Sequence, residues 1–414
     1  MKLDKSSIIG TCRNILPVYL LLYFLFISNY FKFSFPVITF VVDSLQYISG
    51  KLIHLINAIF IHKEFDGNIT MDDNYWLYVA VVTYFALSIP IGVIWTIVAG
   101  SKGQSKLFFY LNIYSRYYLA FMLLDYGFAK IFGIQFAEPW PNDLIQPLGN
   151  LNVHSLLWDF MGASRSYNLF AGLLEVIPAA LLLFRRTSVI GAIASIAVLL
   201  NVLMLNIGYD VQVKTMTLHL ILIGIFILYP DFDRLLKFFF LNADIQKKRD
   251  MLIIESKFRR ALLILKFILI AYVFFVYVNN KLHARQRLTA SMKSALNGIY
   301  EINRFQNTNE KMRIDDENTK WTKLAMMGGY ATIRFSNDST SVFIASIDTI
   351  KKIVELRSPY DSLFKSSLHF IQNSDQYNFK GVFGIDSVYV SAKKINIEMM
   401  PLNKDRGKIQ WLWY

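Results

Sequence analysis

Long apolar runs, each about the length that crosses a membrane, recur along the first two thirds of the chain. The predicted spans cover residues 15–31, 75–98, 115–132, 167–184, 188–208, 214–229 and 261–278. A helix of about 20 mainly apolar residues crosses the hydrocarbon core of a bilayer. The sequence therefore predicts a mainly α integral membrane protein with seven spans, the third to sixth of which form a four-helix transmembrane bundle.

Three further segments have a mixed pattern. Residues 34–62 are apolar but interrupted by polar residues too often for lipid, which predicts an interfacial or re-entrant amphipathic helix. Residues 156–163, in the long loop after the third span, are predicted to form a short helix. After the sixth span, an apolar stripe lies beside two basic residues and predicts an amphipathic helix for the cytoplasmic leaflet: Leu235, Leu236, Phe239 and Phe240 beside Arg234 and Lys237.

From Lys281 onward the pattern changes to period-two alternation between Asn, Asp, Gly and Ser turns. Seven such segments predict a small antiparallel β barrel or sandwich, with a hairpin across Gly384–Asp386. We expect the interior to be filled by side chains, with four aromatic residues in its core or at its end: Trp321, Trp411, Trp413 and Tyr414. The predicted parts are an N-terminal membrane region (1–106), the bundle (107–242), a cytoplasmic connector with the seventh span (243–280) and the β domain (281–414).

Composition agrees with a membrane location. Hydrophobic residues make up 54% and charged residues 18% of the 414 positions, and the mean hydropathy is +0.37, which excludes an ordinary soluble domain. The net charge of +13 is not taken to indicate a nucleic-acid partner, because the basic residues gather in loops beside the spans and in the C-terminal part. The expected partner is the lipid membrane itself, with a further membrane or periplasmic protein.

The distribution of Lys and Arg predicts the orientation. Fifteen lie before residue 14 and in segments 102–106, 185–186 and 234–260, whereas six lie in the opposite loops. Positive residues favour the cytoplasmic side. The N-terminus, interpreted as an uncleaved signal anchor, is therefore expected inside a bacterial inner membrane, and the β domain in the periplasm. The single cysteine, Cys12, excludes an intramolecular disulfide or a thiolate metal site.

Candidate chemistry lies in the bundle. Antiparallel helices would bring Asp125, Glu175, Asn201 and His219 to one depth, roughly 8–12 Å below the outer surface. Ionisable groups in lipid are costly unless they face one another or a cavity, which predicts a polar pocket in the outer half of the bundle. The full set of pocket candidates is Asp125, Tyr126, Glu175, Asn201, Asn206, Asp210, Lys214 and His219.

Each candidate also has a structural interpretation. Glu175 either hydrogen-bonds between helices or acts on a ligand or proton; Asp210 and Lys214 can form an i,i+4 pair; Asn201 and Asn206 can join helices. A haem would need a second axial ligand for His219, for which His154 is the nearby candidate, so neither haem nor metal is expected. Motifs for nucleotide binding, zinc proteolysis and serine hydrolysis are absent from the sequence.

Three stretches resemble the DoxX family, in its long Bacteroidetes-type form with a C-terminal β domain. They are RYYLAFMLLDYGFAKIFGIQF, LLWDFMGASRSYNLFAGLLEVIPAALLLFRRTSVIGA and NVLMLNIGYDVQVKTMTLHL. The resemblance implies a four-helix membrane fold strongly and an activity weakly. Similar proteins have VPVK where this chain has Val211-Gln212-Val213-Lys214, and no catalytic residues are carried over.

These observations lead to two functional hypotheses. The first is a DoxX-like inner-membrane protein whose pocket binds a quinone or another small amphiphile, as a redox-linked accessory subunit. The second is a non-catalytic assembly or envelope-maturation factor that anchors a periplasmic β interaction domain. Whether the protein is an enzyme stays open between them.

Overall fold

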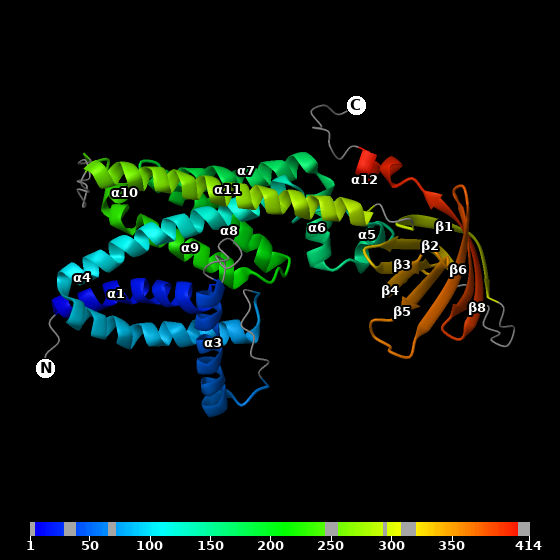
Figure 1. The fold of residues 1–414 in the computed structure, drawn as a ribbon, viewed down its shortest axis with the longest axis horizontal. Helices are drawn as coiled ribbons and strands as arrows, with labels where there is room; N and C mark the ends of the chain where they lie inside the picture. The colour runs from blue at the N-terminus through cyan, green and yellow to red at the C-terminus, as the bar shows by residue number, and fades with distance from the viewer. Residues whose placement is uncertain are drawn as a thin grey trace. The chain divides into compact units, whose positions relative to one another are not determined.

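A computed structural model describes residues 5–28, 39–64, 72–244, 256–292, 296–307 and 320–404. The chain forms two compact units, which we call the helical unit (1–128 with 172–279) and the barrel unit (129–171 with 280–414). The first is helical and the second contains a closed antiparallel β barrel (Figure 1). The fold class predicted from the sequence is confirmed.

The helical unit begins with α1 (Lys5–Leu22), which continues into a π-helical turn, η1 (Tyr23–Ile27). Helix α4 (Tyr75–Ile131) is two helices joined at Gly100, whose φ of 56° and ψ of −178° are not helical. Glycine adopts a positive φ without steric cost, and the chain doubles back at this point (Figure 1). The turn agrees with the break predicted between the second and third spans.

Three more helices complete the bundle with the second arm of α4: α7 (Arg165–Leu182), α8 (Ser188–Gly208) and α9 (Lys214–Leu228). Gly224 of α9 lies so close to its neighbours that an added Cβ would stand 2.8 Å from Cγ1 of Ile196 on α8 and 3.8 Å from Leu119 on α4. Small residues permit this close approach between membrane helices. Helices η5 (Tyr229–Asp231), α10 (Phe232–Phe239) and α11 (Ser256–Met292) follow.

Among the residues that the structure describes, five helices are long and apolar enough to cross a membrane. They cover Tyr75–Gly100, Lys102–Ile131, Ser188–Gly208, Lys214–Phe239 and Arg260–Met292. These correspond to five of the seven predicted spans. The first predicted span overlaps the shorter apolar helix Asn14–Ile27. The fourth is α7, which carries Arg165 and Glu175 within 18 residues.

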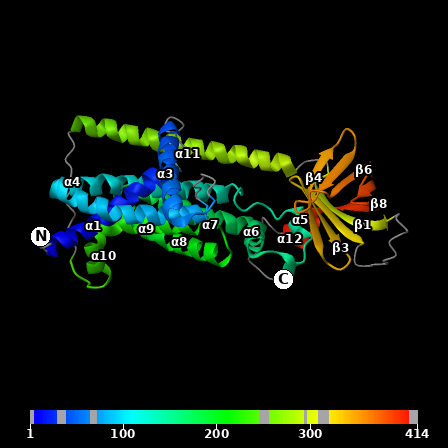
Figure 2. The ribbon, with the colours of Figure 1, turned by 90° about the horizontal axis from the view of Figure 1, so that it is seen from below.

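Helix α3 (Thr39–Ile56), continued by the π-helical turn η3 (Asn57–Ile61), runs across the direction of α1 and α4 (Figure 2). It buries Ser49 and Ile53 and exposes Phe40 and other apolar residues. The hydroxyl of Tyr84 on α4 donates to Ser49 Oγ at 2.8 Å. A crosswise helix with exposed apolar side chains agrees with the predicted interfacial segment.

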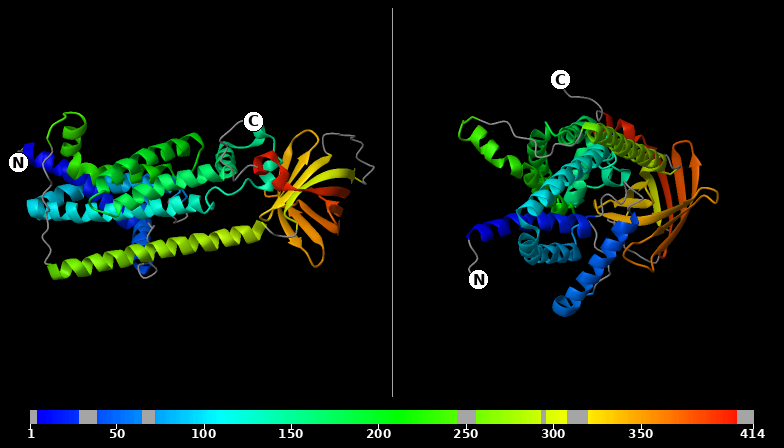
Figure 3. Two further views of the ribbon diagram at one scale, coloured as in Figure 1. Left: turned by 90° about the horizontal axis from the view of Figure 1, so that it is seen from above. Right: turned by 60° about the vertical axis from the view of Figure 1, so that its left-hand side comes forward.

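The barrel has eight strands in sequence order, and β8 pairs with β1 (Figure 3). They are β1 (Gly298–Asn307), β2 (Trp321–Met327), β3 (Tyr330–Phe335), β4 (Thr340–Asp348), β5 (Ile353–Arg357), β6 (Lys365–Asn373), β7 (Gln376–Phe383) and β8 (Asp386–Ile395). The helical turns η7 (Ile397–Met399) and α12 (Pro401–Lys404) follow. The predicted hairpin turns at Gly384, where φ is +65°.

Side chains fill the inside of the barrel. Tyr300 and Phe379 are fully buried among the alternating residues of the strands. Trp321, at 4% exposure, stacks on Phe305 with ring centroids 5.7 Å apart. The predicted core place of Trp321 is therefore confirmed, whereas Trp411, Trp413 and Tyr414 lie outside the described residues.

Within the barrel unit, residues 281–292 form the end of α11, because HARQRLTASM is rich in good helix formers and contains no Gly or Pro. Strand β2 was missing from the seven predicted strands. Its last four residues are all buried, since one face lies inside the barrel and the other is covered, so they do not alternate between apolar and polar.

Segment 129–171 covers the outer face of β1, β2 and β3. It contains α5 (Pro141–Leu144), η4 (Leu148–Asn150) and α6 (Val153–Ala163), and α6 is the helix predicted in this loop. Ile145 packs with Ile299 and Ala325. The guanidinium of Arg334 donates to the carbonyl of Ile145 at 3.3 Å. The loop between the third and fourth predicted spans is thus an integral part of the barrel unit.

Candidate functional site

The best-defined polar contact in the helical unit joins Tyr19 of α1 to His219 of α9. The Tyr19 hydroxyl lies 2.5 Å from Nε2, and Nδ1 lies 2.7 Å from the carbonyl oxygen of Thr215. A carbonyl only accepts, so Nδ1 carries the proton of the neutral imidazole, and Nε2 accepts from the tyrosine. Both residues are at most 5% exposed.

Tyr23, one helical turn after Tyr19, lies flat on the same imidazole. The ring centroids of Tyr23 and His219 are 4.3 Å apart, with an interplanar angle of 7°. The Tyr23 hydroxyl is buried and lies beside Tyr118. Tyr118 shares a 2.8 Å hydrogen bond with Ser28. Two buried phenols therefore lie next to the histidine.

Glu175 faces into the helical unit, as predicted. The side chain of Glu175 is 3% exposed. Helices α7 and α4 pass close together here: a Cβ added to Gly127 would stand 2.9 Å from the Gly172 carbonyl oxygen and 3.3 Å from Glu175 Cβ. Tyr126, next to this glycine, lies within electrostatic range of Glu175 and Asp125. Three of the predicted pocket residues are therefore neighbours.

Tyr126 connects these carboxylates to the tyrosines around His219. Its hydroxyl donates to Met216 Sδ of α9 at 3.5 Å, and it also lies within electrostatic range of Tyr23. We call the combined set the tyrosine–histidine cluster: Tyr19, Tyr23, Tyr118, Asp125, Tyr126, Glu175 and His219. It draws residues from α1, η1, α4, α7 and α9.

Asn206 has the structural role that was one of its two interpretations. Its side-chain amide donates to the Thr217 hydroxyl at 2.9 Å, and this hydroxyl donates to the carbonyl of Val213 at 2.8 Å. Both side chains are buried. The contact joins α8 to α9, and the side-chain amide nitrogen of Asn206 makes it.

Asp210 and Lys214 lie on the turn between α8 and α9. Their side chains form an i,i+4 ion pair at 2.7 Å and are 77% and 28% exposed, as expected for the structural interpretation. Asp73 stabilises the same turn. Its carboxylate oxygens accept from the backbone amides of Lys214 at 2.6 Å and Thr215 at 2.9 Å, which caps α9.

Asn201 corrects the predicted pocket, because its side chain is exposed. The buried positions of α8 are Gly191, Ala192, Ser195, Leu199 and Asn206. At about 100° per residue, position 201 lies about 200° from Leu199 and points outward. Similar depth had placed Asn201 with Glu175, but depth does not determine the direction of a side chain around the helix axis.

The sequence interpretation missed the contribution of α1. Tyr19 and Tyr23 are four residues apart and so share one face of a helix, a pattern that would have marked this span as facing the bundle. His154, in the barrel unit, stacks on Trp158 with ring centroids 3.8 Å apart. Within the described ranges, no group of three or more His, Cys, Asp or Glu residues is arranged to hold a metal ion.

Comparison with known proteins gives one informative relative. No family model matches the chain, and no solved structure matches it. The uncharacterized protein YwoB of Bacillus subtilis (strain 168) is 32% identical over 116 residues, which are 28% of this chain and 73% of YwoB. At this identity and coverage, the chain belongs to the family of YwoB.

Proposed function

We propose that the helical unit binds a quinone or another small amphiphile beside the tyrosine–histidine cluster, as a DoxX-like, redox-linked accessory subunit. The observation that carries this proposal is the buried Tyr23 phenol stacked on the His219 imidazole, with Tyr19 hydrogen-bonded to the same ring. Ionisable residues within membrane helices are expensive and usually functional. A phenol donor beside a neutral imidazole is suited to bind a carbonyl oxygen and to exchange a proton with it.

Glu175 adds a second protonatable group to the same site. Because Tyr126 lies near both Glu175 and Tyr23, a proton taken up at the tyrosines has a nearby carboxylate to reach. Quinone reduction and oxidation require such proton transfer. The proposal therefore assigns Tyr23 to ligand binding, and Glu175 to proton exchange.

We further propose that the protein lies in a bacterial inner membrane, with its N-terminus in the cytoplasm and its barrel in the periplasm. Helices α7, α8, α9 and α11 lie between α5 and the barrel in sequence, yet Ile145 after α5 packs on the barrel. Both must lie on the same side of the membrane, which requires an even number of crossings. Since α8, α9 and α11 are candidate spans, we propose α7 as the fourth crossing.

Ligand retention tests the proposed function. The full chain would be purified in mild detergent, its lipids extracted, and bound quinones measured by mass spectrometry. We expect quinone to copurify with the wild-type protein and with Tyr110→Phe, a control at a tyrosine that is 61% exposed. Tyr23→Phe should lower the recovered quinone about fivefold or more, since one buried hydrogen bond is lost. Equal recovery from both variants would contradict the proposed site.

The alternative function, an assembly or envelope-maturation factor, is favoured by one feature of the barrel. Tyr360, Leu363 and Ile385 are 95%, 89% and 82% exposed. They lie on the β5–β6 and β7–β8 connections, which are at the same end of an up-and-down barrel. Exposed apolar groups at one end are typical of a protein-binding surface.

The β5–β6 connection holds these side chains in place. Ser358 Oγ accepts from the amides of Tyr360 and Asp361, and the Asp361 carboxylate accepts from the amide of Leu363. A pull-down with the full chain distinguishes the two functions. Recovery of secretion or outer-membrane machinery that depends on Tyr360 and Leu363 would favour the assembly role, whereas recovery of a flavoprotein with quinone would favour the first.

A further inference from the structure

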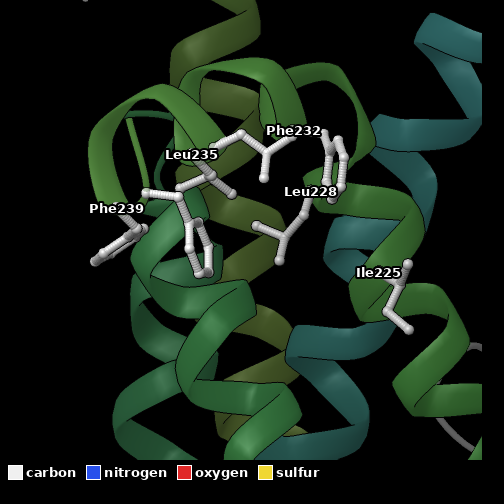
Figure 4. Close-up of a pocket in the computed structure, with 7 residues that line it drawn as sticks. Ile225, Leu228, Phe232, Leu235 and Phe239 are labelled. Carbon is white, nitrogen blue, oxygen red and sulfur yellow. The ribbon is translucent and has the colours of Figure 1, made fainter. Parts of the chain in front are cut away.

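An apolar pocket lies at the end of α9 opposite Lys214, where α10 begins. A pocket of about 220 Å³ is formed there, and all seven residues that line it are apolar (Figure 4). They are Ile225, Leu228, Phe232, Leu235, Leu236, Phe239 and Phe240. A pocket with this lining offers no hydrogen bond, so its occupant must be hydrocarbon.

The bend between the two helices creates the pocket. Helix α9 ends at Leu228, and Pro230 lies in the short turn Tyr229–Asp231 before α10. Proline has no N–H and cannot continue a helix ladder. Arg234 Nη1 then pairs with the buried carboxylate of Asp231 at 2.7 Å, which ties the first turn of α10 to the bend.

Helix α10 separates its apolar and basic residues. Phe232, Leu236 and Phe239 lie on the pocket side and are at least 37% exposed. Arg234 and Lys237 are one turn apart and belong to the polar side, which also carries Asp233. Since α10 ends the candidate span Lys214–Phe239, these cations are placed where lipid headgroups begin.

We propose that this pocket holds part of one acyl chain of an anionic membrane lipid, whose phosphate lies against Arg234 and Lys237. The volume is below the roughly 300–1,000 Å³ of ordinary small-molecule sites, and so suits a section of a chain rather than a whole ligand. Basic residues at a membrane surface attract anionic headgroups. A lipid satisfies both the apolar pocket and the adjacent cations, whereas free phosphate would contact the cations alone.

Native mass spectrometry of the full chain in detergent tests this site. Delipidated protein would be titrated with phosphatidylglycerol or phosphatidylcholine. Leu235→Trp places a larger side chain in the pocket and should weaken phosphatidylglycerol retention about tenfold. The matched control is Leu241→Trp, at a residue that is 68% exposed and is not part of the pocket lining; it should bind like wild type.

A second pair of variants covers the case in which Leu235→Trp does not fold. Phe239→Ala removes a pocket wall and should weaken retention, whereas Phe238→Ala, which is outside the lining, should not. Lys237→Gln should lower phosphatidylglycerol binding about fivefold and leave phosphatidylcholine unchanged. The proposal is overturned if pocket and control variants lose lipid equally, if inorganic phosphate competes fully with the lipid, or if a second copy of the chain crosslinks at α10 in its place.

Discussion

Asp73 caps helix α9 at Lys214, 141 positions later in the chain, by accepting that residue's backbone amide at 2.6 Å. The second carboxylate oxygen accepts from Thr215, and the Asp73 amide donates to the carbonyl of Gln212 at 2.8 Å. The loop before α4 therefore holds the first turn of α9, and His219 lies about one turn further on. The cap connects a surface loop to the position of the cluster histidine.

Loss of this cap should destabilise the protein. Asp73→Ala leaves two amides of α9 without their acceptor, so we expect the free energy of unfolding to fall by about 1–2 kcal/mol. The measurement is thermal unfolding of the full chain in detergent, followed by circular dichroism. Asp72→Ala, at the exposed neighbouring carboxylate, is the control and should have little effect. If the two variants unfold alike, the cap does not support α9.

The hydrogen bond between Tyr19 and His219 should couple the effects of substitutions at these two residues on the free energy of unfolding. Tyr19→Phe leaves buried Nε2 without a donor and should cost about 1–3 kcal/mol. His219→Phe removes the acceptor, so Tyr19→Phe added to it should cost much less. A double-mutant cycle on unfolding free energies measures the difference. Additive effects of the two substitutions would mean that the hydrogen bond does not stabilise the helical unit.

Much of the fold follows from local patterns in the sequence. Long apolar runs predicted five helices that are candidate spans, and alternation predicted seven of the eight strands. Strand β2 was missed because burial on both faces removes alternation. The seventh predicted span ends at residue 278, whereas α11 continues to Met292, because the polar residues 279–292 give no membrane signal although their composition favours a helix.

The tyrosine–histidine cluster was only partly predictable, because the sequence indicates the depth of a residue but not the direction of its side chain. Helix length determines how deep a residue lies, and Glu175 and Asp125 both lie within electrostatic range of Tyr126. It does not determine which way a side chain points, so Asn201 was misplaced. Tyr19, which hydrogen-bonds to His219, lies 200 positions earlier in the chain, and no local pattern identifies such a pairing.

A pH-dependent effect is expected in the barrel unit, at Asp159 of α6. Burial, together with the nearby charge of Asp143, raises the pKa of Asp159 to about 7, compared with about 3.9 in an unfolded chain. The folded state therefore holds this proton between about pH 4 and 7 while the unfolded state releases it. Stability contributed by the protonated carboxyl is complete below about pH 4 and is lost as pH rises to about 7.

Hydrogen exchange of the amides in α6, corrected for intrinsic rates, measures this effect. Protection should be greater at pH 5.5 than at pH 7.5 in the wild-type protein. Asp159→Asn resembles the protonated form and should keep the stronger protection at both values. Asp233→Asn, at an exposed carboxylate elsewhere, should preserve the wild-type difference. Protection that rises with pH would reverse the sign expected for Asp159.

Substitutions at Glu175 and Asn201 can separate a proton-exchange role of Glu175 from a packing role. Glu175 faces inward, whereas Asn201 faces outward. Glu175→Gln keeps the size of the side chain but cannot exchange a proton at neutral pH. We expect normal abundance of this variant in the membrane, with a clear loss of quinone-dependent activity or retention. Asn201→Leu removes a polar group from an outward surface and should leave both quantities unchanged or raise abundance slightly.

Two results would contradict the proton-exchange role. If Glu175→Gln has unchanged retention and unchanged abundance, Glu175 serves only to hold α7 against α4. If its abundance falls as strongly as that of Glu175→Ala, the carboxylate is required for folding, because glutamine preserves shape but not charge. The proposed role requires that Glu175→Gln keep normal abundance in the membrane and lose quinone-dependent activity or retention. Glutamine would then support the fold but not proton exchange next to Tyr126.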